Sequence, residues 1–403
     1  MKRTIFHIDV NNAYLSWSAV ERLRNGETLD LRTVPSIVGG AKEKRHGVVL
    51  AKSTPAKKLG IVTGEPVVMA YRKCSDLISV PPDMDLYAEC SKKMFALLDN
   101  YSDRVEKYSV DEAFLDYTGM EGLLGDPLVC ANKLKEDIKT KLGFTVNIGI
   151  STNKLLAKMA GELEKPDKVL TLYPEEIEEK MWGLPVGELF MVGRKSRNYL
   201  QKIGVHTIGE LAHFPVELLE KELKSMGQLL HNYANGIDPT PVSLTEEQED
   251  VKSIGNSTTL PYDVKKREEA HSVLLYLTES VSQRLRKKSM QCSEIAVSIK
   301  TNEFIVYSKQ MKLSSAVDNS VAIYGFAKEI FDQLWKKEPI RLLGLRLGKL
   351  SEAVSGQVSL LEEEWDKAKK VDMAMDDIRK KFGKHSVGRW GIGQDSGFLE
   401  EEQ

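Results

Sequence analysis

The sequence predicts an α+β protein built from several domains, and three observations lead to that prediction. The 403 residues exceed what one hydrophobic core usually organises, so we expect two to four domains. Short apolar runs with strand-like composition alternate with segments of helical periodicity in the first part of the chain. The polar, acidic stretch TEEQEDVK (245–252) then separates this part from a second block that shows both patterns again.

The elements of the first part follow from periodicity and from helix-ending residues. TIFHIDV (4–10) reads as a short buried strand, and the next segment has helical spacing that closes at Gly26. Residues 35–82 are rich in Gly, Pro, Lys and Val and look like a small insertion between larger pieces. We expect further helices over 13–26, 54–60, 86–102 and 127–142, and strands over 47–52 and 144–151.

The remainder of the chain predicts a helical region, a second α+β region and a tail. Residues 174–236 contain short helices separated by glycines. In the region from about 251 to 350 we expect strands at 293–301 and 340–350 and helices at 266–289 and 321–337. The tail from 351 is acidic and carries one more amphipathic segment, 371–383.

Charge and cysteine content limit the classes of function. The net charge is −2, so binding to nucleic acid has to rest on local basic surfaces. Residues 250–350 hold 17 Lys and Arg against 11 Asp and Glu, and the tail holds 8 against 12, which makes the second block the basic one. Four scattered cysteines suit a reducing compartment, and no apolar stretch is long enough to cross a membrane, so we expect a cytoplasmic protein.

Two adjacent acids, Asp111 and Glu112, interrupt the apolar run YSVDEAFLD. Burying them without a counter-charge is costly, and a hard divalent cation would neutralise them. Asp9, inside another apolar strand, could complete a paired-metal site for phosphoryl transfer. The alternative is that Asp111 and Glu112 are ordinary turn residues and that Asp9 is an N-cap. Adjacent residues on a regular strand face opposite sides, so a shared site requires that the pair lie at a hairpin bend.

Five motifs occur in one order and at characteristic intervals, and together they resemble a known family. They are HIDVNNAYLS, LAKSTPAKKLGI, YSVDEAFLD, NIGISTNKLLAKMAGELEKPDK and the Val192–Gly193 turn. The chain resembles the bacterial Y-family translesion DNA polymerases, in the branch of DNA polymerase IV and the polymerase V catalytic subunit. The resemblance covers residue 1 to about 350.

The resemblance implies an α+β fold of the right-hand polymerase type. It assigns residues 1–12 and 84–172 to the palm, 13–83 to small fingers, and 173–236 to a helical thumb with a helix-hairpin-helix. A linker over 237–249 would lead to an α+β little-finger domain over 250–350, followed by the tail 351–403.

The resemblance also implies the metal and nucleotide ligands. Asp9, Asp111 and Glu112, with the backbone carbonyl of Val10, would hold two Mg²⁺ ions, for which Mn²⁺ can substitute. Tyr14 matches the steric gate that excludes a ribose 2′-hydroxyl, although its position at a strand-to-helix junction also suits a core aromatic residue. Six residues would bind the nucleotide: Asn12, Ala13, Tyr14, Thr54, Lys57 and Lys165.

Lysines in two of the motifs could bind the triphosphate or be solvated. Lys57 replaces the arginine of the commonest polymerase IV pattern, so it offers phosphate a point charge and not a bidentate fork, and the role of Thr54 stays open. Lys165 would reach the β- and γ-phosphates unless it is a solvated surface residue. Lys154 and Lys158 could face the substrate or be solvated on the exposed side of a helix, and we favour the solvated position.

Contacts with DNA and with a sliding clamp are expected from three segments. Gly193, Arg194 and Lys195 match a hairpin whose backbone N–H groups hold a DNA phosphate, although a plain helical hairpin would look similar. Lys252 and Ser253 match an edge strand that lies along the duplex. In the tail, Gln357, Leu360 and Leu361 resemble the bacterial clamp-binding peptide.

Two functions from different classes follow from this resemblance. The first is a monomeric DNA-directed DNA polymerase that adds dNTPs to a primer on template DNA, with low fidelity and no proofreading. The second is a catalytically silent relative that recruits partners to the clamp. Retention of Asp9, Asp111 and Glu112 favours the enzyme.

Overall fold

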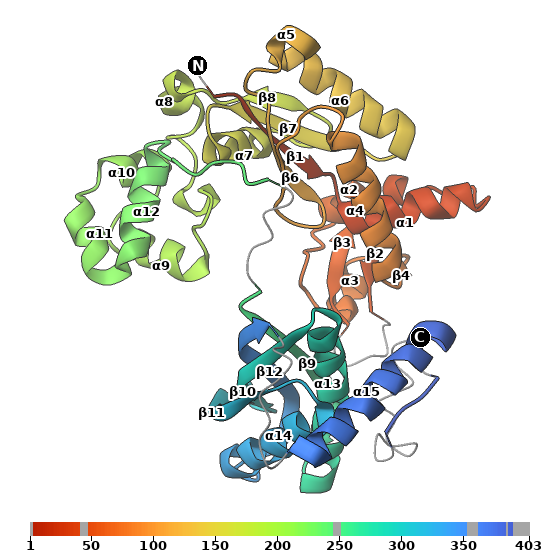
Figure 1. Ribbon diagram of the computed structural model, residues 1–403. Helices are drawn as coiled ribbons and strands as arrows, with labels where there is room; N and C mark the ends of the chain where they lie inside the picture. Colours follow the sequence, from red (N-terminus) through yellow and green to blue (C-terminus); the bar gives the residue numbers. More distant parts are fainter. Residues whose placement is uncertain (1–2, 41–46, 245–250, 353–361, 384–385, 390–403) are drawn as a thin grey trace. The chain divides into compact units, whose positions relative to one another are not determined.

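The computed structural model describes residues 3–40, 47–244, 251–352, 362–383 and 386–389 (Figure 1). The chain divides into two compact units, Met1–Gln248 and Glu249–Gln403. Each unit combines helices with β-sheet and has hydrophobic clusters of its own, so the α+β prediction is confirmed. Within the described residues, no helix combines the length and the apolarity needed to cross a membrane.

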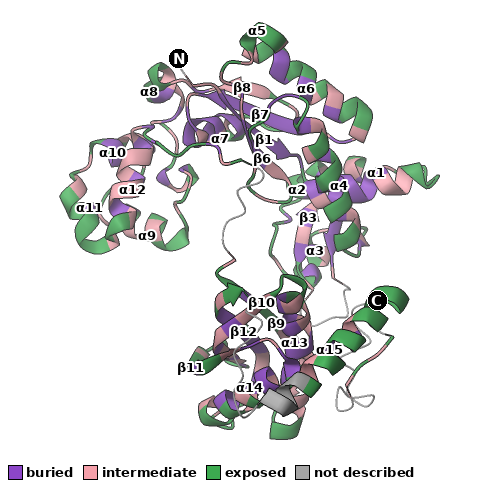
Figure 2. Ribbon diagram, in the orientation of Figure 1, coloured by how far each residue is buried: buried purple, intermediate pink, exposed green. Residues whose placement is uncertain are grey.

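A five-stranded sheet organises the first unit. Its order is β5 (Val105–Lys107), β6 (Glu112–Asp116), β1 (Ile5–Val10), β7 (Val146–Ser151) and β8 (Val169–Thr171). β1 pairs antiparallel with both β6 and β7 and therefore lies in the middle of the sheet. Figure 2 shows β1 and β7 buried along their lengths, as predicted from their apolar composition.

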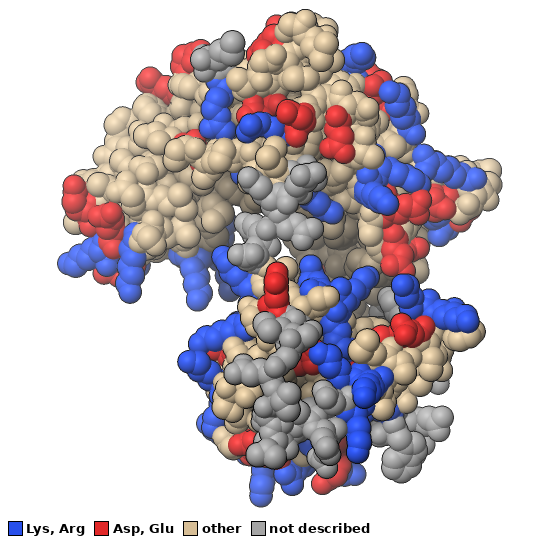
Figure 3. All heavy atoms as spheres, in the orientation of Figure 1, with Lys and Arg blue, Asp and Glu red and all other residues tan. Residues whose placement is uncertain are grey.

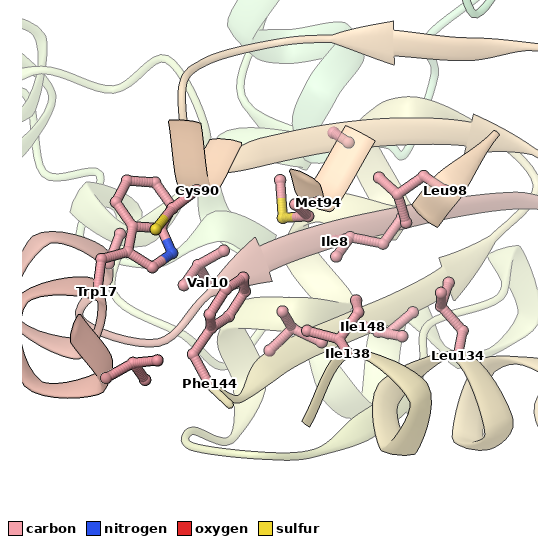
Figure 4. Packing of buried hydrophobic residues seen from close by; sticks show 14 of the residues in the cluster. Ile8, Val10, Trp17, Cys90, Met94, Leu98, Leu134, Ile138, Phe144 and Ile148 are labelled. Carbon is pink, nitrogen blue, oxygen red and sulfur yellow. The ribbon is translucent and has the colours of Figure 1, made fainter. Parts of the chain in front are cut away.

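β1 carries different chemistry on its two faces. Phe6, Ile8 and Val10 enter the main hydrophobic cluster, whereas His7 and Asp9 alternate with them and so face the other side. The helices α4 (Met84–Leu98) and α6 (Pro127–Leu142) cover the apolar face. Figure 4 shows this packing, with side chains of α4 and α6 around Ile8 and Val10 of β1: Met94, Leu98, Leu134 and Ile138.

The opposite face of the sheet is covered by α7 (Lys154–Leu163), which approaches β7 closely. A Cβ atom at Gly149 of β7 would lie 2.0 Å from the carbonyl oxygen of Ala157 and 2.4 Å from the backbone nitrogen of Gly161. Real Cβ atoms are not found this close to backbone, so the packing of α7 on β7 requires glycine at position 149.

The region after β1 forms a smaller layer with its own hydrophobic cluster. α1 (Ala13–Arg24) and the 3₁₀ helix η1 (Leu31–Thr33) lead into a three-stranded sheet, ordered β3 (Val49–Lys52), β2 (Ser36–Gly39) and β4 (Ile78–Val80). The short helices α2 (Thr54–Lys58) and α3 (Val67–Lys73) belong to the same layer, whose cluster includes Ile37, Val49, Ile61 and Val67. The predicted insertion therefore has a separate small core.

The segment after β8 is helical, and the chain then returns to the first sheet. Its elements are η2 (Pro174–Glu176), α8 (Ile177–Lys180), η3 (Val186–Glu188), α9 (Arg194–Lys202), α10 (Ile208–His213), α11 (Val216–Leu223) and α12 (Ser225–Ala234). The short helix α5 (Glu121–Leu124) lies earlier in the chain, between β6 and α6. After α12, Val242 is buried with Ile5 and Phe114, and the Ser243 backbone N–H donates to Glu106 at 2.8 Å. The first part of the predicted linker thus packs on the first unit.

The second unit is a four-stranded antiparallel sheet covered by helices. The strand order is β11 (Val306–Val317), β10 (Met290–Thr301), β12 (Ile340–Glu352) and β9 (Ser253–Val264), and the helices are α13 (Arg267–Lys287), α14 (Ser320–Leu334) and α15 (Glu362–Phe382). α15 packs on α14, and its Asp372 is buried against Arg286 of α13 at 3.0 Å.

Candidate active site

Asp9 and Glu112 lie opposite each other on neighbouring strands, which is the central feature of the site. They are register partners in the antiparallel pair of β1 and β6. Asp111 precedes β6 in a bend, and its carbonyl oxygen accepts a hydrogen bond from the Val10 backbone N–H at 3.1 Å. Asp111 therefore lies at the predicted hairpin bend, whereas Glu112 is the first residue of the strand that follows it. The three acids are brought to one end of the strands.

Ser109 organises this bend. Its hydroxyl donates to Asp111 Oδ1 at 2.6 Å and accepts from the backbone N–H groups of Asp111 at 3.2 Å and Glu112 at 3.0 Å. Sequence analysis missed Ser109. The available signal was a serine two residues before an acid, a spacing at which the hydroxyl can bond to the following backbone N–H groups.

Glu112 is held as a carboxylate by two neighbours. Lys158 Nζ lies 2.8 Å and His7 Nε2 lies 3.6 Å from Glu112 Oε2. Burial alone would raise the pKa of Glu112, but the bonds with His7 and Lys158 outweigh it and lower the pKa to about 2. The pKa of His7 is lowered, chiefly by burial, so the positive charge beside Glu112 comes from Lys158.

The pKa of Asp9 is shifted in the opposite direction to that of Glu112. Burial raises its pKa to about 6, although the ammonium group of Lys165 counteracts the effect. Lys165 forms an ion pair with Asp9 Oδ2 and also contacts Glu162 Oε1 at 2.8 Å. The predicted phosphate ligand Lys165 is therefore placed directly beside the predicted metal ligand Asp9.

The acids offer suitable ligand chemistry for a hard cation. Carboxylate oxygens are the donors that Mg²⁺ and Mn²⁺ prefer, and this face of the sheet supplies them on adjacent strands. Among the described residues, no three His, Cys, Asp or Glu side chains are already grouped to hold a metal ion. Asp9 and Glu112 each direct one oxygen to a lysine.

Three of the nucleotide candidates, Asn12, Ala13 and Tyr14, form the start of α1. Asn12 adopts a left-handed conformation with φ of 50°, which turns the chain from β1 into α1. Tyr14, in the first turn of α1, is half-buried and stacks on Tyr87 with ring centroids 4.5 Å apart. A cavity of about 100 Å³ is lined by Asn12 and Thr54, and by Pro166, which follows Lys165. The other lining residues are Asn11, Leu15, Ser16, Arg32, Ser53 and Thr145. Lys57 is exposed on α2.

The prediction that Lys154 and Lys158 are solvated is wrong. Lys154 Nζ lies 2.6 Å and 2.8 Å from the two oxygens of Glu106, and its side chain is 15% exposed. Lys158 is 12% exposed and bonds to Glu112. The close approach of α7 to the sheet at Gly149 brings this helix near the acids of β5 and β6.

The candidates for DNA contact belong to elements other than β1 and β6. Gly193 is the N-cap of α9, and Arg194 and Lys195 are exposed in its first turn. In the second unit, Lys252 is exposed just before β9, and Ser253 begins that edge strand. The clamp candidates Gln357, Leu360 and Leu361 lie outside the described residues.

Comparisons with known proteins agree with this architecture. The model of the impB/mucB/samB family matches residues 8–162, and the model of that family's C-terminal domain matches residues 251–360. DNA polymerase IV of Clostridium acetobutylicum is 47% identical, with 100% of each chain covered. DNA polymerase IV 2 of Bacillus subtilis is 36% identical, with 96% of this chain and 94% of the relative covered.

Solved structures share the fold. A chain titled Y-family DNA polymerase chimera Dbh-Dpo4(243-245)-Dbh superposes with a TM-score of 0.74 at 24% identity, covering 87% of this chain and 99% of that one. DinB from Sulfolobus solfataricus gives a TM-score of 0.55 at 23% identity, covering 86% and 98%. By its family models, its full-length relatives and its fold, this chain belongs to the impB/mucB/samB family of bacterial Y-family DNA polymerases.

Proposed function

We propose that this translesion DNA polymerase adds dNTPs to a primer 3′-hydroxyl at the site formed by Asp9, Asp111 and Glu112. One observation carries the assignment: Asp9 and Glu112 are register partners on adjacent strands, with Asp111 in the bend directly before β6. Three carboxylates at one end of a buried sheet are costly unless cations neutralise them. Phosphoryl transfer is the chemistry that such a cluster supports.

The proposed metal ligands are Asp9, Asp111, Glu112 and the carbonyl oxygen of Val10, which would hold two Mg²⁺ ions, with Mn²⁺ able to substitute. When bound, such ions lower the pKa of the attacking hydroxyl and neutralise charge on the transferring phosphoryl group. The protein contributes a rigid frame, because β1 and β6 are paired over five residue positions from Ile5 to Asp9. Ser109 adds a fixed orientation for Asp111.

The triphosphate would lie where the start of α1 meets α2 and Lys165. The backbone N–H groups of Asn12 and Ala13 and the charges of Lys57 and Lys165 would bind it, and Thr54 lines the adjoining cavity. Tyr14 would exclude ribonucleotides by a clash with the 2′-hydroxyl. Stacking on Tyr87 supports this role, since a gate has to keep its position when a substrate presses on it.

Primer-template DNA would be held by backbone contacts that do not depend on sequence. Gly193, Arg194 and Lys195 at the N-terminus of α9 suit a phosphate, and Lys252 and Ser253 offer a second contact on the edge strand β9. Figure 3 shows many Lys and Arg side chains on the face of the second unit that is in view. Gln357, Leu360 and Leu361 would bind a sliding clamp, and we infer a monomer that acts in the cytoplasm.

Primer extension with Mg²⁺ on a primed template, undamaged or carrying an abasic site, tests the proposal. The parent should extend both, and Asp111→Ala combined with Glu112→Ala should abolish extension. Asp116→Asn is a matched control, because this acid lies on the same strand and bonds to the Thr118 backbone N–H at 3.0 Å. Extension that survives the double substitution would show that the site is assigned wrongly.

A further inference from the structure

Lys158 of α7 occupies an enclosed position beneath the proposed metal site. Its ammonium group bonds to Glu112 Oε2 at 2.8 Å and lies 5.5 Å from the ring centroid of Tyr108 and 5.4 Å from that of Phe190. The side chain is 12% exposed. Tyr108 and Glu112 lie on either side of the proposed catalytic hairpin bend and Phe190 precedes α9, so one lysine contacts two separate segments of the first unit.

The contacts of Glu112 are divided between its two oxygens. Lys158 and His7 both approach Oε2, whereas Oε1 makes no hydrogen bond with any described residue. A carboxylate with one oxygen anchored has its plane and direction set, and its second oxygen stays available to a ligand. This is the arrangement by which neighbouring groups commonly orient the ligands of a metal.

We propose that Lys158 is a positioning residue that orients the Glu112 carboxylate, so that Oε1 is presented to the metal site. The inference rests on the proposed function, because it takes Glu112 to be a metal ligand. The close packing of α7 at Gly149 and the two aromatic rings hold the ammonium group in place. A lysine otherwise has a flexible stem that loses much rotamer freedom when it is ordered.

The positive charge of Lys158 distinguishes an effect on the orientation of Glu112 from an effect on the affinity for the metal. An ammonium group next to a cation site repels the incoming cation, so Lys158 does not act by attracting the metal. Removing the charge makes the site more negative and should not weaken the binding of a divalent ion. The loss should appear in the maximal rate, because a misdirected carboxylate holds the ion in an unproductive geometry.

The experiment compares Lys158→Met with Lys154→Met in the full chain. Lys154 is the matched control, since it lies one turn earlier on α7, is 15% exposed, pairs with the Glu106 carboxylate and lies 5.0 Å from the ring centroid of Phe114. Lys158→Met should lower kcat for single-nucleotide incorporation by about tenfold, with KM for the dNTP nearly unchanged. Lys154→Met should lose comparable thermal stability and keep its kcat. Phe190→Leu, which removes one ring and keeps the charge, should lower kcat less and in the same direction.

A second readout does not depend on activity. Binding of Mn²⁺ to the free protein, measured by electron paramagnetic resonance, should be no weaker in Lys158→Met than in the parent. Recovery of the kcat of Lys158→Met at high Mg²⁺ would overturn the inference, because Lys158 would then act on metal affinity. An equal kcat in Lys158→Met and Lys154→Met would also overturn it. Both results are distinct from failure of the proposed function, which appears as extension by the Asp111→Ala, Glu112→Ala variant.

Discussion

Asp372 anchors the C-terminal helix α15, and its replacement by alanine should release that helix from the second unit. Its side chain is 2% exposed and accepts hydrogen bonds from the Ser320 backbone N–H at 2.7 Å and hydroxyl at 2.6 Å. It also pairs with Arg286 at 3.0 Å and Arg389 at 2.5 Å. The carboxylate lies at the N-terminus of α14, where the helix dipole favours negative charge.

The free-energy cost of Asp372→Ala depends on the contacts that its arginine partners keep. Removing one partner of a buried ion pair typically costs about 3–5 kcal/mol. The cost of Asp372→Ala should lie at the lower end of this range, because both arginines retain another carboxylate partner. Arg286 still pairs with Asp376 at 2.8 Å, and Arg389 still pairs with Glu279 at 2.8 Å. A loss of about 3 kcal/mol corresponds to roughly a hundredfold shift in the equilibrium for undocking of α15.

Hydrogen exchange of the full chain, followed by mass spectrometry, measures this shift. Peptides from residues 367–382 should exchange up to about a hundredfold faster in Asp372→Ala, whereas peptides from α7 should be unchanged. Asp377→Ala is the control, since Asp377 is exposed on the same helix. Equal exchange of α15 in the parent and in Asp372→Ala would refute the reasoning.

Three further predictions concern the active site. Tyr14→Ala should raise incorporation of ribonucleotides relative to dNTPs in primer extension, and an unchanged ratio would exclude Tyr14 as the gate. Ser109→Ala should lower the single-turnover rate by about tenfold, since Asp111 loses its anchor, and a parental rate would contradict that role. Asp9 has its pKa raised from 3.8 to about 6, so its contribution to the free energy of unfolding is fully present below pH 3.8 and is lost as the pH rises through 6. In EDTA, urea unfolding should show the parent losing stability relative to Asp9→Asn across this window, and a constant difference would rule the shift out.

Elements with strong local signals could be predicted from sequence. The helix expected over 127–142 is α6 itself, because Asp126 caps its N-terminus and Gly143 ends it with φ of 88°. The acids Asp9, Asp111 and Glu112 stood out because each conflicts with an apolar run. The bend at Asp111 followed from the rule that neighbours on a strand face opposite sides.

Features that depend on the approach of distant segments could not be predicted. Lys154 and Lys158 are four residues apart on α7, a spacing that is typical of an exposed helix face. Their burial depends on how near α7 comes to the sheet, and no local pattern encodes that distance. Val242 was likewise assigned to a polar linker, although it is buried against Ile5 and Phe114, which are distant from it in the sequence.

The position of α7 over the sheet depends on Gly149. Any side chain there would collide with the backbone of α7 at Ala157 and Gly161, so the helix would have to lift away from the sheet. Lifting α7 would separate Lys158 from Glu112 and, at the same time, Lys154 from Glu106. A glycine outside the set of proposed ligands therefore limits which sequences can retain the charge balance of the site, and a single added methyl group would be enough to disturb two ion pairs at once.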